Sequence, residues 1–242
     1  MIVNFCGTRG YIEEWNRYHR MHSACLLTHA GRRLLLDAGE NWAGKLAELR
    51  PDWIAITHAH PDHAFGLRDG VGVPVLGTRK THRLLRGFPI SRFHEIKPGT
   101  MTRCGPFQIT AYRVIHSLRA PAVGFRITAG GLTIAYNPDI ISPVRPRAAL
   151  SGVDVYIGDG SSLTRPLVRR HGTLLFGHTT VRAQLGWCRR FSIRRAFFVH
   201  CGKQLVEMDA RELDRAVAEL AGGNPITVVA RDGMRVDLAS LR

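Results

Sequence analysis

The chain has 242 residues, of which 45% are hydrophobic, and it carries 34 Lys and Arg against 19 Asp and Glu, a formal net charge of +15. This length and apolar content allow one large core, so we predict a single domain over residues 1–242. No stretch of about 18 apolar residues occurs, which excludes a transmembrane helix. The five Cys residues are scattered without a Cys-x-x-Cys pair, which favours a reducing, cytoplasmic location.

Apolar runs and turn residues predict strands alternating with helices along the whole chain. The first residues contain no basic stretch followed by an apolar segment, so they predict a strand and not a secretion signal. Strands are predicted near 2–5, 24–28, 33–37, 53–56, 73–76, 107–112, 124–128, 132–136, 153–157, 196–199 and 226–230, and helices near 41–49, 62–68, 79–86, 179–191 and 208–221. This mixture suits two packed sheets with helices outside.

Ligand-type side chains crowd the segment that follows the strand predicted at 53–56. His58 and His60 are two apart in extended chain, so they can share one ion, whereas Asp62 and His63 follow the turn at Pro61 and can face a second. Imidazole and carboxylate groups suit zinc and similar metals, and paired metals are a known arrangement for hydrolysing phosphate esters. The alternative is a His-rich surface loop, but this spacing favours metal binding.

Three later residues repeat the pattern of a ligand type placed just past an apolar run. His116 follows the run 111–115, Asp139 follows the run 132–136 after an Asn-Pro break, and His200 follows the run 196–199. Taken alone, each is better explained as a capping or hydrogen-bonded residue. The repetition favours a site built on loops that a rigid sheet positions.

The motif His58-x-His60-x-Asp62-His63, with the three later residues in the same order, resembles the metallo-β-lactamase fold hydrolases. The resemblance covers nearly the whole chain and includes the strand and turn at 34–39, Gly66-Leu67 after the motif, and a C-terminal hairpin at 228–234. It implies an α/β fold, a four-layer αββα sandwich. The fold hosts lactamases, lactonases, thioesterases, nucleases and some oxidoreductases, so it does not identify the substrate.

The resemblance also implies how two divalent metal ions are held. One site would be made by His58, His60 and His116, the other by Asp62, His63 and His200, with Asp139 bridging them. The metal expected first is zinc, with manganese or iron as alternatives. The metals would hold a water between them and lower its pKa, so that hydroxide becomes the nucleophile. Pro138 stands where the family often has Gly, which changes backbone freedom but keeps the carboxylate.

The segment His178-Thr179-Thr180-x-x-Ala183-Gln184 narrows the resemblance to the tRNA-maturing endonucleases (RNase Z) and related phosphodiesterases. In those enzymes a His before this helix acts on the leaving group, which gives His178 a catalytic role as general acid. The alternative is a helix-terminal residue beside a capping Thr. Asp159, at the end of another apolar run, matches an acidic residue that orients this His, or forms an Asp-Gly turn. Asp62 is predicted to be catalytic as well as a ligand.

The chain departs from the tRNA-maturing enzymes in length between motifs. Asp139 follows His116 by only 23 positions, which leaves no room for the tRNA-clamping insertion of the bacterial enzymes. The large inserted domain of the β-CASP nucleases does not fit either. A compact enzyme like the cyclic-phosphate phosphodiesterases fits better, although their extra Cys ligands for a structural zinc are absent.

Basic residues cluster between Asp159 and His178 and again after the helix predicted at 179–191. The clusters consist of Arg165, Arg169, Arg170 and His171, and of Arg189, Arg190, Arg194 and Arg195. They indicate an anionic, phosphate-containing substrate, with nucleic acid as one option. The alternative is a general Arg bias of the proteome.

We therefore predict a dinuclear metal-dependent hydrolase, either a phosphodiesterase or a nuclease. The alternatives are a lactonase or thioesterase of the same fold, and a non-enzymatic, metal-stabilised nucleic-acid-binding module. The sequence does not indicate an oligomeric state.

Overall fold

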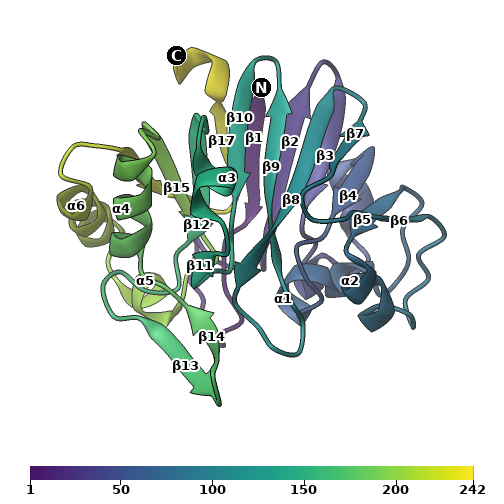
Figure 1. Cartoon of the computed structure of the whole chain (residues 1–242), viewed down its shortest axis with the longest axis horizontal. Coiled ribbons are helices and arrows are strands. Elements are labelled where there is room, and N and C mark those ends of the chain that lie inside the picture. The colour runs from purple at the N-terminus through teal and green to yellow at the C-terminus, as the bar shows by residue number, and fades with distance from the viewer. Residues whose placement is uncertain (242) are drawn as a thin grey trace.

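Two β-sheets pack face to face in the computed structural model, which describes residues 1–241 (Figure 1). The first sheet has the spatial order β17 (Met234–Asp237), β1 (Ile2–Gly7), β2 (Ala24–His29), β3 (Arg32–Leu36), β4 (Trp53–Ala55), β5 (Val75–Gly77) and β6 (Phe93–Glu95). The second has the order β11 (Ser142–Pro143), β8 (Phe107–Ile115), β9 (Val123–Ala129), β10 (Leu132–Tyr136), β12 (Val155–Asp159), β15 (Arg195–Val199) and β16 (Ile226–Val229), with β7 (Met101–Cys104) paired to β8.

Helices cover the outer face of each sheet (Figure 1). The first sheet is covered by α1 (Pro61–Ala64) and α2 (Arg79–Leu84) together with short 3₁₀ turns, and the second by α3 (Pro146–Leu150), α4 (Val181–Arg190), α5 (Lys203–Glu207) and α6 (Ala210–Ala221). Within residues 1–241, none of these helices has the length and apolar character needed to cross a membrane.

Side-chain alternation along the strands explains why the sheets are buried on both faces. On β3, Leu34 and Leu36 point into the core between the sheets, whereas Leu35 packs under the outer helices. On β15, Phe197 faces the inner core and Phe198 faces the core beneath α4 and α6. The three buried clusters fill the three gaps between four layers. The predicted four-layer αββα sandwich is therefore confirmed, and the single-domain interpretation stays a prediction.

Local capping and glycine residues shift the predicted helix bounds. The helix predicted at 41–49 is wrong, because residues 40–42 and 46–49 form separate 3₁₀ turns and Gly44, with φ +71, interrupts them. The last helix starts at Ala210, where the Asp209 side chain accepts hydrogen bonds from the Arg211 and Glu212 amides, and it ends before the left-handed Gly222.

The segment at 228–234 is not a hairpin. Strand β16 lies parallel to β15 in the second sheet, whereas β17 lies antiparallel to β1 in the first. The turn between β16 and β17 is held beside the first sheet, because the Asp232 carboxylate accepts hydrogen bonds from the amides of Thr8, Arg20 and Met21. A true hairpin is instead formed by β13 (Leu167–His171) and β14 (Leu174–His178), which pair only with each other among the described strands.

Candidate metal centre

The His-rich segment 57–63 is held at the end of β4 by a buried carboxylate. Asp37, which follows β3, accepts hydrogen bonds at Oδ1 from the amide of Thr57 (2.8 Å) and from its hydroxyl (2.9 Å). Its other oxygen lies 2.9 Å from Nδ1 of His63. Pro61 then begins α1, and His60 precedes it without using its side chain as a cap. The imidazoles are therefore free to turn toward the second sheet.

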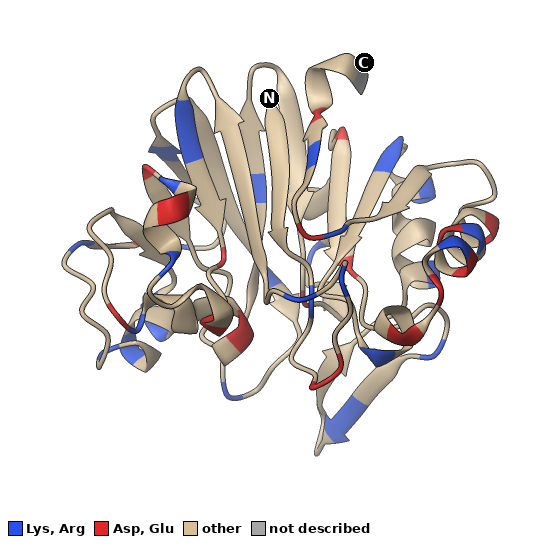
Figure 2. Cartoon of the chain, turned by 180° about the vertical axis from the view of Figure 1, so that it is seen from behind, with Lys and Arg blue, Asp and Glu red and all other residues tan. Residues whose placement is uncertain are grey.

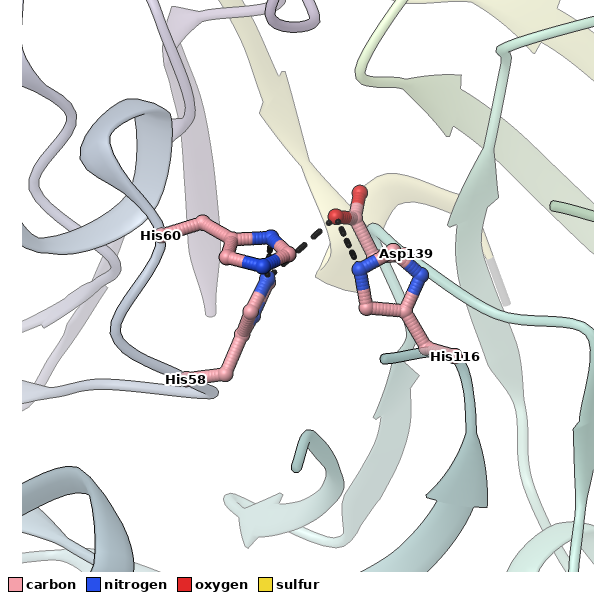
Figure 3. A group of neighbouring side chains, drawn as sticks. All are labelled: His58, His60, His116 and Asp139. Atoms are coloured by element: carbon pink, nitrogen blue, oxygen red, sulfur yellow. Dashed lines mark hydrogen bonds and ion pairs between the residues drawn. The ribbon is translucent and has the colours of Figure 1, made fainter. Parts of the chain in front are cut away.

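The four residues of the first predicted site lie together at the ends of both sheets. Nε2 of His58 and Nε2 of His116 lie 3.4 Å and 3.1 Å from Oδ2 of Asp139, and the His58 and His60 ring nitrogens approach to 2.9 Å. Figure 3 shows His58 and His60 approaching from one side, and Asp139 and His116 from the other. The ligand atoms of all four lie within 4.8 Å of one another.

The second predicted site shares Asp139 with the first. Nε2 of His200 lies 2.9 Å from Oδ2 of Asp62 and 3.0 Å from Oδ1 of Asp139. Nε2 of His63 lies 3.2 Å from Asp62 and 3.3 Å from Asp139. Asp139 therefore contacts both groups: Oδ2 lies beside His58, His116 and His63, and Oδ1 lies beside His200.

The outward-facing ring nitrogens have partners that aim the other nitrogen inward. His58 Nδ1 lies 3.0 Å from the Thr57 hydroxyl, His116 Nδ1 donates to the Gly177 carbonyl (3.1 Å), and His200 Nδ1 lies 3.1 Å from the Ser161 hydroxyl. Such contacts fix tautomer and ring orientation in metal sites. Asp37 plays this part for His63, and the sequence did not single it out.

The donor set fits a pair of divalent metal ions. Nε2 of His63, Nε2 of His116 and Oδ1 of Asp139 are buried atoms with no hydrogen-bond partner among the described residues. Leaving buried polar atoms unpaired is costly, and these three belong to the two ligand groups that share Asp139. The separations of 2.9–3.4 Å between ligand atoms approach the spacing of about 3.3 Å that tetrahedral zinc with bonds of about 2.0–2.1 Å requires.

The electrostatics of the pocket favour cations. Burial lowers the pKa of His58 and of His116, which keeps both imidazoles in the neutral form that binds metals. Burial raises the pKa of the Asp62 and Asp139 carboxyls, but neighbouring imidazoles bring both well below their usual range. Burial lowers the pKa of His200, but Asp139 and Asp62 raise it to about 10. The two carboxylates therefore attract positive charge, whether from protons or from metal ions.

His178 stands beside both ligand groups and is paired with Asp159. Its Nδ1 lies 2.8 Å from Oδ2 of Asp159, and its ring lies 4.9 Å from that of His116 and 5.3 Å from that of His200. Burial lowers the pKa of His178, but the Asp159 charge and hydrogen bond raise it above its ordinary value. The cap of α4 is Thr180, whose side chain accepts from the Ala183 amide, so His178 is not engaged as a cap.

Asp159 is fully buried and its carboxylate is fixed in place. Its oxygens accept hydrogen bonds from the amides of Ile140 (3.0 Å) and Ser161 (2.8 Å). The Gln184 side chain brackets its backbone, since Oε1 accepts from the Asp159 amide and Nε2 donates to the Asp159 carbonyl. An Asp-Gly turn alone would not require this arrangement.

A cavity of about 970 Å³ opens over the ligand groups and His178. Arg165 and Lys203 are its cationic lining residues. A neighbouring cavity of about 530 Å³ lies along the base of the β13–β14 hairpin and is lined by Arg165 and Arg169. Two Arg residues of the first basic cluster, Arg165 and Arg169, therefore line the cavities beside the ligand groups. Figure 2 shows Lys and Arg on many elements, including this hairpin.

The other basic residues singled out by the sequence lie elsewhere. Arg170 and His171 are exposed on β13, further along the hairpin from the cavity. The second basic cluster belongs to the end of α4 and the start of β15, outside the set of residues that line the two cavities.

Comparison with known proteins identifies the family. A family model described as "Beta-lactamase superfamily domain" matches residues 32–201, so the chain belongs to this superfamily and is a hydrolase of the metallo-β-lactamase type, a fold that implies divalent metal binding. A ribonuclease Z from Pyrobaculum islandicum is 30% identical over 131 residues, which cover 48% of this chain and only 42% of that protein.

Solved structures share the fold over almost the full length. The metallo-β-lactamase fold protein YhfI from Bacillus subtilis has a TM-score of 0.74 at 18% identity, covering 97% of this chain and 98% of that one. A diphosphatase from the PhnP family has a TM-score of 0.71 at 18% identity, covering 97% and 96%. Zinc-bound PqqB from Methylobacterium extorquens has a TM-score of 0.73 at 18% identity, covering 98% and 100%.

Proposed function

We propose that the protein is a dinuclear metal-dependent phosphodiesterase or nuclease in which His178 is the general acid. The observation that carries this proposal is the 2.8 Å pair of His178 and Asp159 beside two ligand groups that share Asp139. A pair of metal ions without a general acid could hydrolyse esters of several classes. A separate, oriented imidazole suits a reaction that expels a poorly stabilised alkoxide.

Each side chain has a definite task in this proposal. His58, His60, His116, Asp62, His63, His200 and the bridging Asp139 hold the ions. When bound, two divalent ions would lower the pKa of a water molecule and neutralise charge on the phosphoryl oxygens. Asp159 accepts the Nδ1 proton of His178, which leaves Nε2 as the atom that gives a proton to the leaving oxygen.

Phosphodiester substrates are favoured over neutral esters by charge and by the relatives. Arg165 has no acidic partner among the described residues, whereas Lys203 is paired with Glu14 and Glu207. A free guanidinium at the cavity, in a chain of net charge +15, attracts anions. Similar proteins include a ribonuclease Z and a diphosphatase, which act on phosphate-containing substrates by name.

We also propose that the bound metal is zinc and that the protein works in the reducing environment of the cytoplasm. Five imidazoles and two carboxylates form a donor set that suits zinc. The free cysteines are Cys6, Cys25, Cys104, Cys188 and Cys201, all buried. Unpaired thiols of this kind are typical of cytoplasmic proteins.

The test is a substrate panel for the zinc-loaded protein. We expect turnover of bis(p-nitrophenyl) phosphate that is lost in Asp139→Ala, and little turnover of lactones and thioesters. Turnover of lactones or thioesters without phosphodiester hydrolysis would contradict the proposal and support the first alternative. Nucleic-acid binding that survives His178→Ala, with no turnover of any substrate, would support the non-enzymatic alternative.

A further inference from the structure

An exposed aromatic side chain stands on the wall of the large cavity and has no part in the proposed chemistry. Tyr11 is 62% exposed and lines the cavity together with Gly10 and Ile12. Aromatic rings supply much of the binding energy in ligand sites. A ring that is already exposed to solvent at a cavity wall gives up few protein contacts when a ligand covers it.

The loop that carries Tyr11 is fixed directly against the ligand groups. The Gly10 amide donates to the Cys201 carbonyl (3.0 Å), and the Cys201 amide donates to the Thr8 carbonyl (2.6 Å). A Cβ on Gly10 would lie only 3.0 Å from Cε1 of His200, so the chain passes as close to this ligand as a side chain permits. Tyr11 is the next residue along.

The Arg9 side chain holds the other side of the same loop. Nη1 donates to the Ile12 carbonyl (2.7 Å), and Nη2 donates to the side-chain oxygen of Asn41 (3.2 Å). The backbone around Tyr11 is therefore tied before any ligand arrives. Ordering costs on binding are small for a ring presented by a fixed loop.

The cavity offers polar groups that complement an aromatic phosphate ester. Arg165 supplies the unpaired cation described above. The Gln204 side chain lines the cavity, and its oxygen accepts from the Leu163 amide (3.2 Å), which leaves its NH₂ group free to donate to a ligand. Ser161 and Ser162 add hydroxyls to the lining.

We propose that Tyr11 is a stacking platform for a nucleobase, so that the substrate is a nucleotide ester or a nucleic-acid strand. The inference rests on the proposed function, because the phosphate is taken to lie at the ligand groups. The cavity of about 970 Å³ is at the upper end of the range of about 300–1,000 Å³ for ligand pockets, which is more than a dialkyl phosphate fills. Stacking on an aromatic ring accepts any base, since every base has a π-face.

The test compares two ligands that differ only in the base. Binding of adenosine 5′-monophosphate and of ribose 5-phosphate to the zinc-loaded protein would be measured by titration calorimetry. We expect wild type to prefer the adenosine ligand. Tyr11→Ala should weaken its binding by about 5- to 100-fold and change ribose 5-phosphate less than twofold, while Tyr11→Phe keeps the preference.

Trp15→Ala provides the matched control. Trp15 is 63% exposed on the same loop and lies outside the residues that line the cavity, with Arg20 stacked over its ring. This variant should bind both ligands as wild type does.

Equal binding of the two ligands by wild type, or an equal loss in Trp15→Ala and Tyr11→Ala, would overturn the inference. Absence of phosphodiester turnover would contradict the proposed function instead, and leaves this comparison of binding intact.

Discussion

The ligand cluster and the β13–β14 hairpin border the same cavity but are built in opposite ways. The ligand residues are mostly buried and follow strands of both sheets, with their outer ring nitrogens held by neighbours such as Asp37. The hairpin pairs with no other described strand, and β13 is exposed along its length. Its base nevertheless delivers His178 to the site, anchored by the Gly177 amide on the His116 carbonyl (2.7 Å).

This difference suggests a division of labour between the two regions. The buried cluster tolerates little change, because each atom has a partner or faces the centre. The hairpin can vary in charge and length without disturbing the sheets, so it is suited to setting which substrate approaches. Substitutions in the cluster should therefore change metal content and turnover together, and those on the exposed part of the hairpin, away from His178, should change substrate preference alone.

The largest effect is expected from Asp139→Ala. Losing the shared carboxylate removes a ligand from both groups, so zinc should fall below two ions per chain and turnover should drop to background. Metal content would be measured by mass spectrometry alongside the melting temperature of the loaded protein. Asp154→Asn is the control that should retain both ions, because Asp154 precedes β12 and accepts a hydrogen bond from the Thr133 amide, away from Asp159. Two ions retained in Asp139→Ala would contradict the bridging role.

Asp159→Asn should lower turnover by about 10²- to 10⁴-fold without loss of metal, because it removes the charge that orients and polarises His178. Asp159 raises the pKa of His178 against the effect of burial. A general acid works only while protonated, so activity falls as pH rises through its pKa. Losing the charge lowers that pKa and should shift this alkaline limb to lower pH. A shift to higher pH would show that His178 is not the acid.

Asp37→Asn should weaken zinc binding by about 10- to 100-fold, as second-layer substitutions in metal sites do. The change removes a charge partner of His63 and keeps an oxygen for the Thr57 hydrogen bonds. Competition with a chromophoric chelator would measure the affinity. Unchanged affinity would mean that the charge of Asp37 does not strengthen metal binding through His63.

Arg169→Ala/Arg170→Ala is expected to have the smallest effect. The melting temperature should stay unchanged, while KM for an oligonucleotide rises a few-fold and depends less on salt, because fewer phosphates are contacted. Arg211→Ala, on the exposed side of α6, is the control. An equal effect in the control would mean that overall charge, and not the hairpin, attracts the substrate.

The same contrast explains what the sequence could predict. The ligand residues were recognisable because each follows an apolar run, and the carboxyl ends of such strands meet in space. Asp37 also follows an apolar run, but its pairing with His63 depends on the parallel register of Leu36 with Ala55. Strand β13 carries exposed Arg and His without alternation, so no strand is predicted there from the sequence. The turn at Asp232 depends on hydrogen bonds to residues more than 200 positions away, which no local pattern reveals.

The most direct test of the account is the dependence of kcat/KM on the leaving group in wild type and His178→Ala. A series of phosphodiesters with alcohols of increasing pKa would be compared with aryl esters in both zinc-loaded proteins. We predict that the variant loses about 10²- to 10⁴-fold in kcat/KM with alkyl leaving groups and far less with p-nitrophenolate, which departs without a proton. An equal loss across the series, with both ions bound, would contradict a role for His178 in protonating the leaving oxygen.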